Sequence, residues 1–428
     1  MSILDAPVRR AAARLPDALA RAVAEPKAYA DLDGWHEQLR IVRRDHPFAR
    51  SELPDFRPFW VASKFDDIQA IARQNDIFLS GLGALAPRAM ADKVGAEAQG
   101  FRSVVGMNPP EHATYRLITQ AWLAPKNIRK LEAGMRSLAR RFVDRMVDAG
   151  GEIDFAKDVG AHYPLLVIMS ILGVPPEDEP MMLRLTQEYF GNSDEELSRR
   201  RTLSPEETAA GLMETIAEVS GYFRKVTADR RRAPADDLAS VIANARIDGE
   251  LLPEPDSLGY YITIAFAGHD TTSSSVAGGL WALAERPDEL AKVRADLGLV
   301  PSLVEESIRW TSPVYQFVRV AGRDTEVRGQ AVKAGDQVVL SFPSGNRDED
   351  AFEAPFEFRA DRRSLRHVAF GYGPHQCLGM HLARMEMAIF YEELLPRLQS
   401  LELAGQPSRT TTNFVGGPKS VPIRYEFG

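Results

Sequence analysis

Cysteine is the scarcest residue in this chain: Cys377 is the only one among 428 residues. A single cysteine cannot form an internal disulfide bond, which excludes a secreted scaffold whose fold depends on disulfide bridges. Three interpretations of Cys377 remain open at this point, namely a small buried apolar side chain, a nucleophile, or a metal ligand.

Long apolar runs are missing as well. The longest run, residues 163–174, is far shorter than the roughly 20 residues that a membrane-spanning helix needs. Residues 1–26 alternate arginines, alanines and acids without an apolar core, so we expect no signal peptide. A net charge of -8 disfavours binding to nucleic acid or to an anionic membrane. With 44% hydrophobic and 26% charged residues, the composition is that of a globular protein, which we expect to be cytoplasmic.

The dinucleotide-binding pattern Gly-x-Gly-x-x-Gly is also absent. A redox enzyme with this sequence would therefore receive its electrons from another protein. No internal repeat or low-complexity linker marks a boundary, so we predict one domain over residues 1–428. Residues 1–45 form an N-terminal segment that carries none of the motifs described below.

Glycine, by contrast, is concentrated around the cysteine. Residues 370–379 read Phe-Gly-Tyr-Gly-Pro-His-Gln-Cys-Leu-Gly, and glycine lets a backbone turn sharply and approach a flat ligand closely. The amphipathic segment 379–396 follows directly. We therefore expect Cys377 just before a helix, where the helix dipole and free amides stabilise a thiolate and suit it to bind iron.

Three further segments carry polar side chains at helical spacing. His112 and Arg116 are four residues apart, on one helical face. Residues 267–275 read Ala-Gly-His-Asp-Thr-Thr-Ser-Ser-Ser inside a long helix, where hydroxyls that bond the preceding turn bend the helix and open a groove. Helical geometry directs His269 away from Asp270 and Thr271, so we predict no role for it. The pair formed by Glu306 and Arg309, with spacing i, i+3, lies between this helix and the cysteine.

Periodicity and turn residues predict the main elements. The Ser204-Pro205-Glu206-Glu207 segment is a capping box, which opens a long helix. The predicted helices span residues 65–72, 128–149, 153–173, 177–190, 205–232, 255–285 and 379–396, and the predicted strands span residues 59–62, 314–320 and 332–342.

Taken in order, these motifs resemble those of the cytochrome P450 monooxygenases of the soluble bacterial, ferredoxin-dependent type. The resemblance implies a mainly α fold with small β-sheets, in which haem b lies between the long helix and the cysteine loop and Cys377 ligates the iron. It implies that Asp270 and Thr271 deliver protons to bound O2 during catalysis, and that Arg362 joins Glu306 and Arg309 in a buried network. The cofactor-binding residues that it implies are His112, Arg116, Ala267, Gly268, Arg319, His367, Phe370, Gly371, Cys377 and Gly379.

The resemblance is strongest to the subfamily whose members hydroxylate compounds such as alpha-terpineol. It implies a small hydrophobic substrate, such as a monoterpenoid or an alkylbenzene like p-cymene, and electrons from a 2Fe–2S ferredoxin with a separate NAD(P)H-dependent ferredoxin reductase. The ferredoxin is expected on a basic patch of Arg116, Lys126, Arg129, Lys130, Arg363, Arg366 and Arg384. The substrate-facing residues that it implies, besides part of the 81–90 loop, are Thr263, Phe266, Ala267, Val314, Phe317, Val318, Phe414 and Val415.

Two alternatives stay open on the sequence alone. A haem-thiolate protein could act on another hydrophobic substrate, such as a steroid, a fatty acid or a polyketide, or without O2. A cysteine-dependent hydrolase would need a histidine base near Cys377, for which His375 and His381 are candidates. The hydrolase interpretation does not explain the hydroxyl-rich helix, and it predicts a colourless protein.

Overall fold

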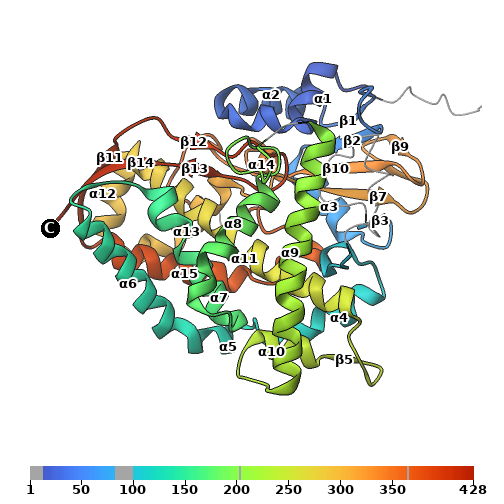
Figure 1. The fold of residues 1–428 in the computed structure, drawn as a ribbon. Helices are drawn as coiled ribbons and strands as arrows, with labels where there is room; N and C mark the ends of the chain where they lie inside the picture. The colour runs from blue at the N-terminus through green and yellow to red at the C-terminus, as the bar shows by residue number, and fades with distance from the viewer. Residues whose placement is uncertain (1–12, 82–99, 202–203, 364–365) are drawn as a thin grey trace, which may run out of the picture.

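The chain is represented by a computed structural model that describes residues 13–81, 100–201, 204–363 and 366–428. Helices form most of the molecule, and a small mixed sheet lies beside the N-terminal helices (Figure 1). The helices are α1 Asp17–Ala24, α2 Leu32–Asp45, α3 Phe65–Arg73, α4 Glu111–Gln120, α5 Pro125–Ile128, α6 Glu132–Asp148, α7 Tyr163–Leu172, α8 Glu179–Phe190, α9 Pro205–Arg232, α10 Leu238–Asn244, α11 Glu254–Ala284, α12 Pro287–Ala295, α13 Val300–Thr311, α14 Phe342–Gly345 and α15 Met380–Leu394. The strands are β1 Phe48–Ser51, β2 Phe59–Ala62, β3 Phe78–Leu79, β4 Glu152–Asp154, β5 Arg246–Ile247, β6 Glu250–Leu251, β7 Gln316–Ala321, β8 Thr325–Val327, β9 Gln330–Val332, β10 Gln337–Ser341, β11 Leu398–Leu403, β12 Ser408–Arg409, β13 Pro418–Ser420 and β14 Pro422–Phe427.

Helix α11 is the centre of the helical part. It runs without interruption for 31 residues and packs against α7, α13, α8, α9 and α15. Most of its side chains are buried on all sides, which explains why its apolar residues follow no single stripe. Within the described ranges, no helix combines the length and the apolar character that crossing a membrane requires.

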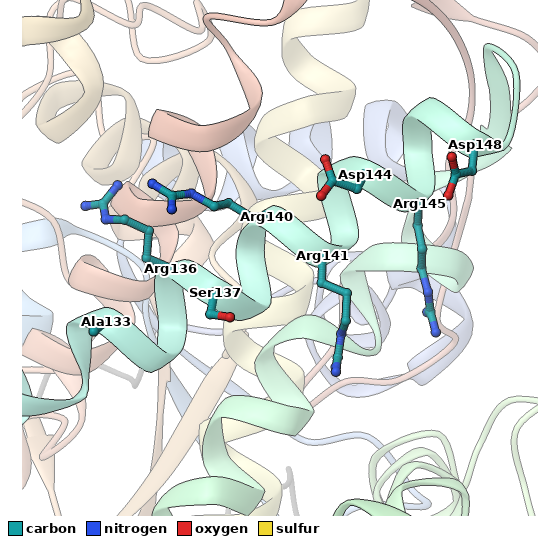
Figure 2. A pocket seen from close by; sticks show the side chains of 8 residues that line it. All are labelled: Ala133, Arg136, Ser137, Arg140, Arg141, Asp144, Arg145 and Asp148. Carbon is teal, nitrogen blue, oxygen red and sulfur yellow. The ribbon is translucent and has the colours of Figure 1, made fainter.

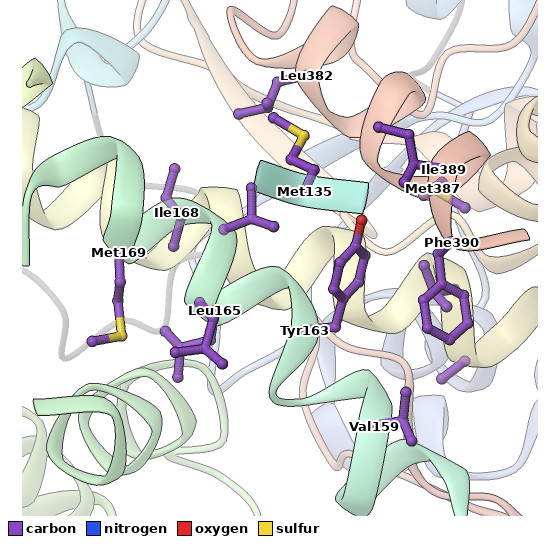
Figure 3. Close-up of a cluster of buried hydrophobic side chains, with 14 of the residues drawn as sticks. Met135, Val159, Tyr163, Leu165, Ile168, Met169, Leu382, Met387, Ile389 and Phe390 are labelled. Carbon is purple, nitrogen blue, oxygen red and sulfur yellow. The ribbon is translucent and has the colours of Figure 1, made fainter. Parts of the chain in front are cut away.

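The main apolar core lies between α6, α7 and α15. Figure 3 shows Met135 of α6, Tyr163 of α7 and Phe390 of α15 converging there, and the rings of Tyr163 and Phe390 lie 5.2 Å apart. The Tyr163 hydroxyl donates to the backbone carbonyl of Glu386 at 3.1 Å, so its one polar atom is satisfied inside this core. The helix that follows the cysteine loop is thereby fixed to the body of the protein.

The largest sheet has the strand order β1-β2-β10-β7-β3. Strand β7 is antiparallel to β10, with Val318 opposite Val339 and Phe317 opposite Leu340. Because successive side chains of a strand point to opposite faces, Phe317 and Arg319 share one face of the sheet and Val318 lies on the other. The Val318 face packs against an N-terminal apolar cluster that includes Tyr29 and Trp35.

Most predicted elements are observed, including the capping box, in which the Ser204 hydroxyl accepts a hydrogen bond from the Glu207 amide at 3.3 Å. The prediction of one helix over residues 153–173 is wrong. This segment contains strand β4, a π-helical turn at Ala156–Gly160 and helix α7. Strand β4 pairs with β14 near the C-terminus, and the Asp154 carboxylate accepts the Val421 amide at 2.8 Å. A pairing partner more than 250 residues away overrides the local helical pattern.

Candidate functional site

The cysteine loop enters helix α15 through a tight turn. The Cys377 amide donates to the Phe370 carbonyl at 2.9 Å, and Gly371 and Gly373 adopt positive φ angles of 68° and 70°. A side chain at position 373 would also meet the Ala72 carbonyl oxygen at 2.6 Å, so only glycine fits there.

Cys377 combines an accessible side chain with many close neighbours. The residue is exposed, yet burial among neighbouring atoms raises the pKa of its thiol, an effect that the amides of Gly379 and Met380 and the charge of Arg116 partly offset. Both observations follow if the thiol points into an internal space that is closed off from bulk water. These amides are the donors that a thiolate at this position would use.

Ala267 on α11 is likewise exposed, although Phe266 before it is buried. The next residue, Gly268, packs closely on α7, because a Cβ there would lie 2.8 Å from Cδ1 of Ile168. One turn later, the Thr271 hydroxyl donates to the Ala267 carbonyl at 2.7 Å. Burial raises the pKa of the adjacent Asp270 carboxyl to about 7. This stretch of α11 therefore presents small residues, a hydroxyl, and a carboxyl group whose pKa lies near neutral pH.

Four cationic or basic side chains gather near the cysteine loop: His112, Arg116, Arg319 and His375. The rings of His112 and His375 lie 3.9 Å apart, and Arg116 donates to the Gln376 carbonyl at 2.5 Å. Arg319 is 6% exposed and its guanidinium donates to the Val318 carbonyl at 3.1 Å.

No carboxylate is bonded to any of these four side chains in the described part of the chain. Burial, followed by the charge of Arg319, lowers the pKa of His375 to about 3. Burial likewise lowers the pKa of Arg319 to about 10 and that of His112 below its ordinary value. Arg116 and Arg319 carry the positive charge of this cluster, and burial without a carboxylate partner makes that charge costly, so the cluster fits a bound dianionic group.

The structure does not bring His367 into this cluster, and its prediction as a cofactor-binding residue is corrected here. His367 lies 3.2 Å from the Glu305 carboxylate, which also accepts from Arg384 at 2.5 Å. Burial alone would raise the pKa of Glu305, but these two cations lower it to about 2. His375 occupies the place that we predicted for His367. Its position inside the loop, two residues before the cysteine, was the available signal.

The predicted ion-pair network is assembled and almost fully buried. Arg309 donates to both carboxylate oxygens of Glu306 at 2.7 Å, and Arg362 donates to the same carboxylate at 3.0 Å. Both arginines also donate to backbone carbonyls of the 353–357 segment. The network thus ties α13 to the segment that leads into the cysteine loop.

Contacting aromatic rings join α8, α11, β7 and the segment around Phe414. The Phe414 ring lies 5.7 Å from Phe317 and 5.9 Å from Phe190, and the Phe190 ring lies 6.4 Å from Phe266. Sequence reasoning missed Phe190, although an aromatic pair just before Gly191 marks the end of α8. Val314 and Val415 form an isolated β-bridge next to Phe414.

Val318 and Thr263, two residues that we predicted to face the substrate, make other contacts in the structure. Val318 is wrong as a pocket residue, because it lies on the sheet face opposite to Phe317. The Thr263 hydroxyl is bonded to the Ser103 hydroxyl at 2.8 Å, so it is already satisfied by the protein. Apart from Gly81, the predicted 81–90 loop lies outside the described residues.

The surface near α15 carries positive charge. Lys126, Arg129 and Lys130 are exposed, and the α5 helix that bears Lys126 packs against α15. Arg384 is half-buried and held by Glu305, while Arg116 points to the cysteine loop. Of the predicted patch, the 126–130 segment is exposed beside α15, and Arg363 and Arg366 are exposed as well.

A separate surface hollow of about 590 Å³ lies along α6. Figure 2 shows that four arginines of this helix line it. Arg136 and Arg140 are paired with Glu393 of α15 at 3.0 Å, so much of this charge is neutralised. We assign it no part in the internal site.

Comparison with known proteins agrees with this geometry. Residues 87–423 match the family model described as Cytochrome P450. The chain therefore belongs to the cytochrome P450 family, in which a cysteine thiolate holds the haem iron. Cys377 is the single cysteine of this chain.

Individual relatives cover nearly the whole chain. Cytochrome P450-terp from Pseudomonas sp is 44% identical over 97% of this chain and 99% of its own. Linalool 8-monooxygenase from Pseudomonas putida is 30% identical over 91% of this chain and 95% of its own. The crystal structure of CYP108D1 from Novosphingobium aromaticivorans DSM12444 superimposes with a TM-score of 0.89 at 42% identity, covering 97% of this chain and 100% of that chain.

Proposed function

We propose that this monooxygenase hydroxylates a small hydrophobic compound with O2 and electrons from a 2Fe–2S ferredoxin, itself reduced by a separate NAD(P)H-dependent reductase. Monoterpenoids such as alpha-terpineol and alkylbenzenes such as p-cymene are the first candidates. The observation that carries the proposal is that the cysteine loop leads into α15, which packs against α11, the helix that carries the acid Asp270 and the alcohol Thr271.

In this proposal the anionic edge of the haem lies against His112, Arg116, Arg319 and His375. The charges of Arg116 and Arg319 have no carboxylate partner in the described residues, and propionates would supply one, while the rings of His112 and His375 would offer N–H donors. Ala267, Gly371 and Gly379 would leave room for the flat ring, and Gly268 and Phe370 are the other residues that we propose to lie near it. When bound, the haem supplies the activation of O2, and the protein supplies position, exclusion of water and protons.

Asp270 and Thr271 are the proposed proton donors. A carboxyl with a pKa of about 7 can release and regain a proton near neutral pH, which is the property that general acid–base catalysis needs. The Thr271 hydrogen is directed to the Ala267 carbonyl, so the hydroxyl oxygen is free to accept a hydrogen bond from water or from the acid.

Several observations favour a compact substrate. The contacting rings of Phe190, Phe266, Phe317 and Phe414 would offer substrate an apolar wall, and the nearby Thr263 hydroxyl is already bonded. Among the relatives, one is a linalool 8-monooxygenase. Another structure, from Mycobacterium marinum, is a cytochrome P450 in complex with pseudoionone, with a TM-score of 0.85 at 29% identity, covering 99% of this chain and 100% of that chain.

The reduced ferredoxin is proposed to dock on the exposed 126–130 segment, where positive charge would steer an acidic partner. Lys130→Glu should slow ferredoxin-driven reduction at low salt much more than at high salt, as measured by stopped-flow spectroscopy. Lys225→Glu makes the same change of charge on α9 and is the matched control. Equal rates in both variants would count against this docking site.

The decisive test of the function is an absorption spectrum of the purified protein, reduced with dithionite under carbon monoxide. A strongly red-shifted Soret band is expected for thiolate ligation by Cys377. Alpha-terpineol and p-cymene should then shift the ferric protein toward high spin, whereas a bulky steroid should not. A colourless protein would refute the function, and a spin shift by the steroid alone would refute the substrate class.

A further inference from the structure

His269 lies next to the proposed proton donor, which corrects the expectation that it faces away. It is 1% exposed, and its Nε2 lies 2.8 Å from the Ala161 carbonyl oxygen, just after the π-helical turn. Its other nitrogen, Nδ1, lies 3.4 Å from Oδ1 of Asp270. This nitrogen has no hydrogen-bond partner among the described residues.

The Ala161 carbonyl decides which nitrogen carries the hydrogen. A carbonyl oxygen can only accept, so Nε2 donates to it and carries the proton. Burial lowers the pKa of His269 to about 4, so near neutral pH the ring holds this one proton only. Nδ1 then carries a buried lone pair, 3.4 Å from Oδ1 of Asp270.

A lone pair at this place favours the neutral form of the acid. An ionised carboxylate would turn its own lone pairs toward Nδ1 and gain nothing, whereas a protonated carboxyl can donate its hydrogen. The 3.4 Å separation exceeds the usual limit of about 3.2 Å for a hydrogen bond. The hydrogen bond proposed below therefore requires the carboxyl group to rotate toward Nδ1.

The charged groups around the pair do not change this conclusion. His162 and Glu179 are the titratable neighbours of His269, and they are bonded to each other at 2.6 Å. Asp270 is bonded to no cation in the described residues, and burial alone is the cause of its raised pKa. His269 is therefore the polar side chain in contact with this acid.

We propose that His269 is a positioning residue, whose Nδ1 accepts a hydrogen bond from the neutral Asp270 carboxyl and holds this acid ready beside Thr271. The proposal rests on the proposed function for its catalytic meaning. Once Asp270 has released its proton, the carboxylate and Nδ1 no longer attract each other. The carboxylate then turns away and regains one proton from solvent, so that the protons balance over a cycle.

Two substitutions separate the two nitrogens of His269. In His269→Gln, the side-chain amide can still donate to the Ala161 carbonyl, but no acceptor faces Asp270. In His269→Asn, the side-chain oxygen replaces Nδ1, and the bond to Ala161 is lost. The first variant keeps the structural anchor, and the second keeps the acceptor.

Infrared spectroscopy of the haem-loaded protein tests the contact itself. The C=O stretch of the protonated Asp270 carboxyl is identified by its loss in Asp270→Asn. A carboxyl that donates a hydrogen bond absorbs at lower wavenumber, so the band should move to higher wavenumber in His269→Gln and stay in place in His269→Asn. His162→Leu, which removes a nearby histidine, should leave the band unchanged. An unmoved band in His269→Gln would overturn the proposal.

The second measurement is the product formed per electron consumed, with haem content and the carbon monoxide spectrum as controls. A positioned acid contributes about 10²-fold or more to a proton-transfer step, so loss of its orientation in His269→Gln should lower this ratio severalfold. His269→Asn should stay close to wild type. A normal carbon monoxide spectrum with equal ratios in both variants would refute His269 alone, whereas an absent spectrum in the wild type would refute the proposed function.

Discussion

The buried network around Glu306 offers the sharpest prediction about this protein. In Glu306→Gln the side chain keeps its shape but loses its charge, while Arg309 and Arg362 remain buried against it. Glu306 is 1% exposed and Arg309 is also 1% exposed, so water cannot replace the lost carboxylate oxygens. The amide nitrogen of the new residue would face a guanidinium, donor against donor.

The expected cost follows from this burial. Removing one partner of a buried ion pair costs about 3–5 kcal/mol, because the other charge stays buried and unpaired. Two guanidiniums share Glu306, so we expect the upper end of this range. Domains of ordinary stability have about 5–15 kcal/mol in total, so the loss is a large fraction. We also expect the variant to purify without haem, since the network holds the segment that leads into the cysteine loop.

Urea unfolding followed by circular dichroism measures the loss, and the ratio of Soret to protein absorbance measures haem content. Glu402→Gln is the control, because its pair with Arg424 is more than half exposed and is worth about 0–1 kcal/mol. Arg309 holds the pKa of Glu306 below its ordinary value of 4.5 against the effect of burial. The stabilisation that the Glu306 ion pairs give is therefore fully present above pH 4.5, and it is lost as the pH falls through the lower pKa of Glu306 in the folded state. A loss below 1 kcal/mol, with normal haem content, would refute the reasoning.

Three further predictions concern other parts of the site. Arg319→Leu removes a buried cation that has no carboxylate partner in the described residues. The variant should purify with much less haem, while the stability of the haem-free protein should be nearly unchanged. Equal haem retention would contradict this prediction. The buried Asp194 carboxylate connects the loop after α8 to Lys419 at 3.1 Å and to the Thr411 amide at 2.9 Å. Asp194→Ala should therefore speed substrate dissociation about tenfold in stopped-flow experiments, which is equivalent to about 1.4 kcal/mol. Folding raises the pKa of Asp270 from 3.8 to about 7, so the folded state binds a proton that the unfolded state has lost. The free energy of unfolding of the wild type should therefore fall, relative to that of Asp270→Asn, as the pH rises from about 4 to about 7. Urea unfolding at several pH values measures this difference.

Local patterns were enough for much of the fold and for some site residues. Glu306 and Arg309 are one helical turn apart, so their contact follows from helix geometry alone. The capping residues at 204–207 and the glycines of the cysteine loop likewise act on their immediate neighbours. The place of Cys377 just before α15 needed no tertiary information.

The errors arose where side-chain direction depends on distant partners. Val318 faces the N-terminal cluster because β7 pairs with β10 in a particular register, and a shift of one residue would reverse its face. His367 and His375 are equally plausible as sequence neighbours of the cysteine. Only the fold brings Glu305 to the first and His112 to the second.

His269 shows the same division within one helix. The sequence by itself determined that it follows Gly268 and precedes the acid, on a helix whose local hydrogen bonds are set by nearby residues. Only the tertiary structure decided that the Ala161 carbonyl fixes its Nε2 hydrogen and turns Nδ1 to Asp270. The reason is physical: backbone geometry and capping are short-range, whereas burial, charge compensation and the choice of hydrogen-bond partner depend on segments that meet only after the chain has folded.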